Sequence, residues 1–183
     1  MTSAPPNPTR RITSNDEKGN SYFTKTIPES LPITMDLGGA LARLAYTTER
    51  PPTQTTKNKD LNEYEKSITH EPPPLVRSDG GTNIWFVDTP PQGESPVHRT
   101  ISVDIVVHIL GELELTLTSF NGNVDGECEK RIIKPGDVTI QRATLHKWRN
   151  PSKTQWARML AVMNEAQPVV VNEGGTTLKT EFL

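Results

Sequence analysis

Apolar and polar residues alternate along the second half of the chain, and this period of two is typical of half-buried β-strands. In the run 112–117, leucines occupy every second position between glutamates and a threonine. The run 97–110 predicts one long strand or a bent pair of strands, and 82–88 predicts a strand that a Pro-Pro pair ends. Further strands are predicted at 129–142, with a break at Pro135-Gly136, and at 144–150 and 156–165.

The turns and the first half of the chain complete this outline. Asn-Gly and Asp-Gly pairs predict a hairpin turn at 121–127. Residues 42–47 indicate a short strand, with a helical turn as the alternative, and the polar segment 51–74 shows no pattern and is predicted to be a loop. Several short strands with Gly, Pro and Asn turns and few helix signals favour an all-β sandwich or barrel.

Prolines divide the chain into parts of different character. The chain contains 16 prolines, and most of them precede residue 96. We therefore predict a flexible N-terminal tail at 1–20, a proline-rich arm of short strands and loops at 21–95, a barrel core at 96–166 and a C-terminal tail at 167–183. The arm is expected to pack on the barrel.

Composition narrows the class of protein. A chain of 183 residues is long enough for one domain with its own core. Its 20 basic and 22 acidic residues are well mixed, so no nucleic-acid-binding surface is indicated. The N-terminus lacks the apolar core of a secretory signal, no stretch approaches the roughly 18 apolar residues of a spanning helix, and the single Cys128 excludes an internal disulfide. We expect a soluble, cytoplasmic protein that binds neither nucleic acids nor membranes.

Two of the predicted strands carry polar side chains on one face. Successive side chains of a strand point to opposite faces, so one face of the first strand is predicted to present His98, Thr100, Ser102, Asp104, Val106 and His108. Its other face, from Ile101 to Ile109, is apolar and needs a cover, from the arm or from a second subunit. In the second strand the same face is shared by Thr144, His146, Trp148 and Asn150. If these two faces meet inside a barrel, they form a polar site in an apolar wall, which is typical of a small-molecule pocket.

The spacing of these residues resembles that of the cupins. The second cupin motif places a glycine, a proline, a glycine, a histidine and an asparagine at fixed intervals. Gly136, His146 and Asn150 match it, whereas Arg142 and Thr144 stand where the proline and the second glycine would be.

The first cupin motif is matched less fully. His98 stands at its first histidine, Asp104 at its glutamate and Gly111 at its glycine, but Thr100 replaces its second histidine. The resemblance covers about residues 95–165. Within the cupins, the sequence looks most like small cupin-domain proteins of fungal metabolism. It implies an all-β, cupin-type double-stranded β-helix, or jelly-roll barrel, and a homodimer that the apolar sheet face would join.

The resemblance also implies a metal-binding position. A full cupin set is three histidines and one glutamate, and the corresponding residues here are His98, Asp104 and His146. Two imidazoles and a carboxylate suit one divalent ion, Fe, Mn, Ni or Zn, and a metal-free pocket is the alternative. If the strand bends, His108 is a candidate for the missing ligand.

Three functions are consistent with such a pocket and a small organic substrate. The first hypothesis is a lyase or isomerase of secondary-metabolite biosynthesis, which dehydrates, decarboxylates or isomerises an oxygenated polyketide-like or aromatic intermediate. Its catalytic residues would be His146 as base or acid, Asp104 as its orienter, and His98. The residues expected to bind substrate are Trp148, Arg142, Thr100, His108 and Arg158. The alternatives are a non-haem metal-dependent oxygenase and a non-catalytic ligand-binding barrel.

Overall fold

Two antiparallel sheets form most of the structure, a computed structural model that describes residues 3–119, 128–171 and 175–183. The predicted hairpin turn at 121–127 lies outside the described residues. The larger sheet has six strands in the order β10 (Val138–Arg142), β7 (Ser102–Leu110), β12 (Ala157–Glu165), β5 (Thr82–Thr89), β4 (Leu41–Thr48) and β3 (Met35–Asp36). The smaller sheet has five, in the order β15 (Glu181–Phe182), β6 (His98–Arg99), β11 (His146–Arg149), β8 (Leu113–Leu117) and β9 (Glu129–Ile133).

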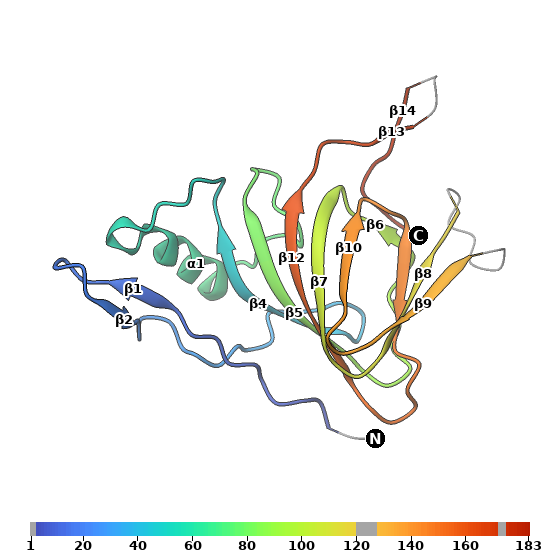
Figure 1. Cartoon of the computed structure of the whole chain (residues 1–183), viewed down its shortest axis with the longest axis horizontal. Coiled ribbons are helices and arrows are strands. Elements are labelled where there is room, and N and C mark those ends of the chain that lie inside the picture. Colours follow the sequence, from blue (N-terminus) through green and yellow to red (C-terminus); the bar gives the residue numbers. More distant parts are fainter. Residues whose placement is uncertain (1–2, 120–127, 172–174) are drawn as a thin grey trace.

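The two sheets curve around a common interior, as Figure 1 shows, and this arrangement is the predicted jelly-roll barrel. Two small hairpins stand outside it: β1 (Thr13–Asn15) with β2 (Ser21–Phe23), and β13 (Val170–Val171) with β14 (Thr176–Thr177). β4 and β5, from the range predicted to be an arm, are strands of the six-stranded sheet. Among the described residues, no helix is long and apolar enough to cross a membrane.

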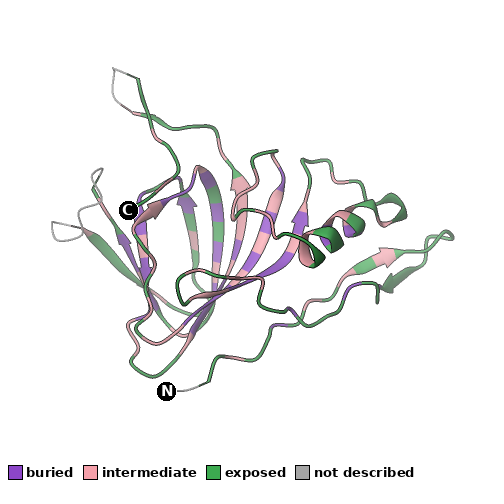
Figure 2. Ribbon diagram, turned by 180° about the vertical axis from the view of Figure 1, so that it is seen from behind, coloured by how far each residue is buried: buried purple, intermediate pink, exposed green. Residues whose placement is uncertain are grey.

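Alternating burial along β7 fixes which side chains enter the barrel. Its buried residues are Ser102, Asp104, Val106 and His108. Its exposed residues are Val103, Ile105, Ile109 and Leu110. Figure 2 shows this change of burial from residue to residue along the strands. The predicted parity of this strand is therefore confirmed, and the polar face is the inner one.

The predicted break at Pro135-Gly136 is the point where the chain passes from one sheet to the other. β9 pairs with β8 in the five-stranded sheet, and β10 pairs with β7 in the six-stranded sheet. Gly136 has a φ of +96°, which favours glycine, and its N–H donates to the carbonyl of His108 at 2.9 Å. This turn therefore places β10 beside the polar strand β7.

The prediction of a loop at 51–74 is wrong for part of that segment. A short 3₁₀ turn, η1 (Thr56–Asn58), leads into helix α1 (Lys59–Thr69). Leu61, Tyr64 and Ile68 recur at helical spacing, and the Tyr64 hydroxyl donates to the carbonyl of Leu44 at 2.7 Å. This apolar face is short and interrupted by charges, and it packs against β4.

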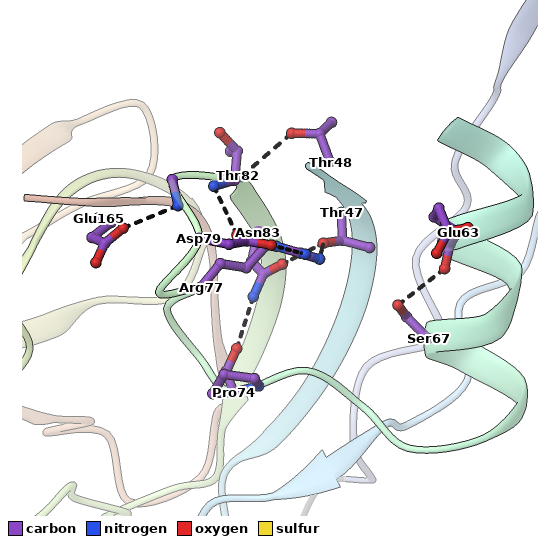
Figure 3. Close-up of polar contacts among 12 residues, drawn as sticks. Thr47, Thr48, Glu63, Ser67, Pro74, Arg77, Asp79, Thr82, Asn83 and Glu165 are labelled. Atoms are coloured by element: carbon purple, nitrogen blue, oxygen red, sulfur yellow. Dashed lines mark hydrogen bonds and ion pairs between the residues drawn. The ribbon is translucent and has the colours of Figure 1, made fainter. Parts of the chain in front are cut away.

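A polar network fixes the entry to β5 after α1. Asn83 is buried at the start of the strand, donates to the carbonyl of Pro74 and accepts from the Thr47 hydroxyl (Figure 3). Arg77 binds both Asp79 and the Thr47 hydroxyl. These contacts join the segment before β5 to the neighbouring strand β4.

A buried ion cluster holds the N-terminal segment over the outer face of the six-stranded sheet. Asp88 is fully buried and receives Arg43 at 2.5 Å and Arg158 at 2.6 and 2.8 Å. The same two guanidinium groups donate to the Asn7 side chain and the Pro6 carbonyl. The N-terminal segment around Pro6 and Asn7 therefore lies against the outer side of β4, β5 and β12. The outer residues of β7 and β10 are exposed, Val138 at 56% and Ile140 at 53%.

We predict that Asp88→Asn lowers the free energy of unfolding by about 3–5 kcal/mol, because two buried guanidinium groups lose their shared carboxylate. Chemical denaturation at pH 7 measures the change. Glu29→Gln, which breaks the exposed pair of Glu29 with Arg11, is the control and is expected to cost less than about 1 kcal/mol. Equal effects of the two variants would contradict the assigned role of Asp88.

The homodimer stays a prediction, and the exposed apolar face of β7 and β10 provides its test. The double variant Ile105→Asp/Ile140→Asp places charge on two directly opposed residues of that face. It is expected to convert a dimer into a monomer of normal secondary structure, as measured by light scattering and circular dichroism. Val170→Asp, at an exposed position of β13, is expected to leave the mass unchanged. A monomeric wild-type protein would contradict the prediction.

Candidate functional site

A cavity of about 390 Å³ lies between the two sheets. Its walls are mainly apolar and include Trp85, Val106 and Met159. The lining residues that are themselves exposed, Gly38 and Phe182 among them, mark its mouth. A cavity of this size suits a small organic molecule.

Three ring side chains form a row on the five-stranded sheet. His98 on β6 lies directly opposite His146 on β11 and Phe182 on β15. The two imidazole centroids are 4.2 Å apart, and the Phe182 ring stacks on His98 at 5.4 Å. All three line the cavity, so strand pairing brings the two predicted histidines together there.

Backbone carbonyls fix the tautomer of both histidines. Nδ1 of His146 lies 2.9 Å from the Thr144 carbonyl, and Nδ1 of His98 lies 2.9 Å from the Pro96 carbonyl. Since a carbonyl oxygen only accepts, each Nδ1 carries the proton and each Nε2 keeps its lone pair. The Thr144 carbonyl thus orients the His146 ring, which is the role that was predicted for Asp104.

Both imidazoles are neutral at neutral pH. Burial, and next the neighbouring His98, lower the pKa of His146 to about 3. Burial also lowers the pKa of His98. The row therefore offers the cavity two neutral nitrogen acceptors.

The opposite wall carries a second row, on the six-stranded sheet. Asp104 on β7 lies between Gln141 on β10 and Met163 on β12, and all three line the cavity. The Ser102 hydroxyl hydrogen-bonds to the Asp104 carboxyl, and Ser102 and Thr100 are joined at 2.8 Å. Oδ1 of Asp104 is buried without a hydrogen-bond partner among the described residues.

Burial raises the pKa of Asp104 to about 6, because the apolar cavity disfavours its charged form. The hydrogen bond from Ser102 opposes this change and is the smaller effect. A carboxyl group with a pKa near neutrality both takes and gives a proton under ordinary conditions. Asp104 is therefore the cavity group best suited to proton transfer.

The remaining predicted site residues are divided between the cavity and other places. Trp148 and Thr100 line the cavity, as predicted. His108 is buried beyond the lining and contacts Trp148 at 5.4 Å. Arg142 is exposed, and Arg158 is bound to Asp88 on the outer side of the sheet. Neither of these two arginines, which were expected to bind substrate, lines the cavity, because strand parity turns both side chains away from it.

Gln141 and Phe182 are among the lining residues that sequence reasoning missed. Gln141 immediately precedes Arg142, and its inward position follows from its pairing with Asp104. No pattern within this strand separates Gln141 from Arg142, because the register of β10 against β7 decides which of the two points inward. Phe182 lies in the predicted C-terminal tail, where no pattern indicated a strand.

The predicted metal ligands fit a metal ion only in part. The free Nε2 atoms of His98 and His146 are suitable donors, because each ring is already oriented by a carbonyl. Within the described part of the chain, however, no three His, Cys, Asp or Glu side chains are grouped so that they could hold one metal ion. Asp104 stands on the opposite sheet and does not complete such a set.

Comparisons with known proteins identify relatives of this chain. The chain is 39% identical over 173 residues to the phomopsin biosynthesis cluster protein C′ of Diaporthe leptostromiformis, covering 93% of this chain and 86% of that protein. It is 36% identical over 166 residues to a cupin-domain-containing oxidoreductase of Neurospora crassa, covering 90% and 77%. A cupin 2 conserved barrel domain protein from Salinispora arenicola CNS-205 superposes with a TM-score of 0.45 at 15% identity, over 74% of this chain and 82% of that one. No family model matches the sequence.

We predict that Asp104→Asn stabilises the protein at pH 8 and has little effect at pH 4. A raised carboxyl pKa means that folding disfavours the ionised group, so stability is lost as pH rises from 3.8 through about 6. At 1.36 kcal/mol per unit of pKa, the variant gains up to about 3 kcal/mol above that range. Denaturation at the two pH values measures it, and an equal gain at both would contradict the burial of an ionisable Asp104.

Proposed function

The chain belongs to the fungal cupin-domain proteins of secondary-metabolite biosynthesis clusters, and on this premise we propose that it is a lyase or isomerase. Its substrate would be an oxygenated aromatic or polyketide-like intermediate, which suits an apolar cavity that contains a few polar groups. The observation that supports this best is the carboxyl group of Asp104, which lines that cavity. Its Oδ1 has no hydrogen-bond partner among the described residues, and its pKa is about 6.

Asp104 acts first as a base and then as an acid. The ionised carboxylate takes a proton from a carbon next to a substrate carbonyl, which leaves an enolate and a neutral Asp104. The acid then returns that proton to another carbon, which isomerises the substrate, or to a hydroxyl group, which leaves as water. A positioned group of matched pKa contributes roughly 10²–10⁴-fold to such a rate.

The hydroxyls of Thr100 and Ser102 position this carboxyl group. Ser102 donates to the carboxylate, so its oxygen is free to accept from Thr100. This chain orients the carboxyl group, and Oδ1, which has no hydrogen-bond partner among the described residues, is the oxygen that the proposal assigns to proton transfer. The hydrogen bond from Ser102 favours the ionised form, and with a pKa of about 6 Asp104 serves as a base near pH 7.

The two histidines bind the substrate in this proposal. His146, with its pKa of about 3, is too weak a base at neutral pH, so proton transfer is assigned to Asp104. The lone pairs on Nε2 of His98 and His146 accept hydrogen bonds from hydroxyl groups of the substrate. The imidazoles therefore hold one end of the molecule against the five-stranded sheet while Asp104 acts from the opposite wall.

A second candidate is an oxidoreductase, because a relative 36% identical to this chain bears that name. Such an enzyme must pass electrons to an acceptor, and a purified protein would contain a bound metal or would consume oxygen with its substrate. A ligand-binding barrel would bind the same compound without converting it. Incubation with the compound therefore has a different outcome for each of the three functions.

The experiment uses the compound that accumulates in the host when the gene is deleted, incubated with the purified protein in D₂O. We predict either an isomer, which carries deuterium at carbon where Asp104 exchanges its proton with solvent before returning it, or a dehydrated product that gains no deuterium at carbon. Activity should persist in EDTA, and kcat/KM should fall as pH drops through about 6 because Asp104 becomes protonated. Mass spectrometry and oxygen uptake provide the measurements.

Asp104→Asn is expected to lose at least 100-fold in kcat, in line with the usual contribution of acid–base catalysis. Asp16→Asn, in the distant β1–β2 hairpin, is the matched control and should retain full activity. A product that has gained oxygen or lost two hydrogens, with loss of activity in EDTA, would support the oxidoreductase instead. Binding without conversion would overturn both enzymes.

A further inference from the structure

The amide group of Gln141 is the most conspicuous polar group of the cavity that the proposed chemistry does not use. Its side chain lines the cavity, and the residue is only 5% exposed. Neither Oε1 nor Nε2 has a hydrogen-bond partner among the described residues. A buried amide without partners is costly, because it loses its bonds to water and gains none from the protein.

The surroundings of Gln141 restrict what could satisfy it. Its direct neighbour across the strands is the carboxyl group of Asp104, whose Oδ1 has no hydrogen-bond partner among the described residues. The described lining of the cavity contains no lysine or arginine. An anionic ligand group would therefore be buried beside a carboxyl group with no cation to compensate its charge, so we take the group beside Gln141 to be neutral.

A primary amide presents a donor and an acceptor side by side, and its best partner presents the complementary pair. We infer that the ligand of this cavity carries a primary carboxamide or a lactam, which pairs with Gln141 through two hydrogen bonds. The ligand carbonyl accepts from Nε2, and the ligand N–H donates to Oε1. The apolar remainder of the ligand lies against Trp85, Trp148 and Met159.

This inference rests on the same cavity as the proposed function and specifies its substrate class. A hydrogen bond from Gln141 to the ligand carbonyl acidifies the carbon beside it, within the region that Asp104 reaches from the adjacent position. Gln141 is thus a residue that determines specificity and positions the carbonyl. Its binding role does not require that Asp104 transfer a proton.

The test compares three probes of similar size in the wild-type protein and in Gln141→Met, which keeps the length of the side chain and removes the amide. The probes are benzamide, N,N-dimethylbenzamide, which lacks the N–H donors, and benzoate, which is anionic. Titration at pH 7.5, followed by protein NMR, gives each Kd. We expect benzamide to bind about tenfold more tightly than either other probe. The dimethyl compound loses one hydrogen bond to Gln141, and benzoate is repelled by the carboxyl group of Asp104.

In Gln141→Met, benzamide binding should weaken about tenfold to the level of N,N-dimethylbenzamide, whose own Kd should not change. The variant should also unfold at a temperature a few degrees higher, because a buried amide without partners has been removed. Gln155→Met, at an exposed position, is the matched control and should change neither quantity. Equal binding of the two amides by the wild type, or undiminished selectivity in Gln141→Met, would overturn the inference.

Asp104→Asn separates this inference from the proposed function. It is expected to abolish turnover and to keep the preference for benzamide. Loss of the preference in Gln141→Met together with an active Asp104→Asn would overturn the proton-transfer role alone. An inactive Asp104→Asn with no amide preference in the wild type would overturn the ligand class alone.

Discussion

The alternation of side chains along β7 is the constraint on which the rest of the structure depends. Side chains of a strand alternate strictly between its faces, so one nine-residue strand supplies both a polar cavity wall and an apolar outer surface. The neighbours of β7 follow its register: Gln141 on β10 and Met163 on β12 point inward because they lie opposite Asp104. A shift of one residue would place isoleucines in the cavity and Asp104 outside, which the burial of either face opposes.

The same constraint explains the electrostatics of the cavity. Polar groups that alternation brings into an apolar interior lose water, and each of them responds in the way its chemistry allows. Burial raises the pKa of Asp104, keeps His146 neutral and leaves the Gln141 amide without partners. Such costs are typical of sites that a ligand completes, since the protein gives up stability to keep the groups available.

Strand parity could be predicted from the sequence because it is local, whereas the relations between distant strands could not. His98, Asp104 and His146 were placed correctly in one cavity from alternation within their own strands. The choice of Gln141 over Arg142 depended on the register of β10 against β7, and the position of Arg158 depended on a buried partner, Asp88. Helix α1 was missed because its apolar face is short and interrupted by charges, and its stability comes from contacts with β4.

The departures from the cupin motifs act in one direction. Thr100, in place of a histidine ligand, supplies a hydroxyl that joins Ser102, and Ser102 in turn binds the carboxyl of Asp104. Aspartate in place of glutamate shortens the carboxylate side chain, so it reaches less far toward the imidazoles on the opposite sheet. Each replacement makes the residues less suited to hold one metal ion together. What results is a carboxyl group oriented by hydroxyls on one wall and two neutral imidazoles on the other. In the proposed mechanism the carboxyl group transfers the proton while the imidazoles on the opposite wall hold the substrate.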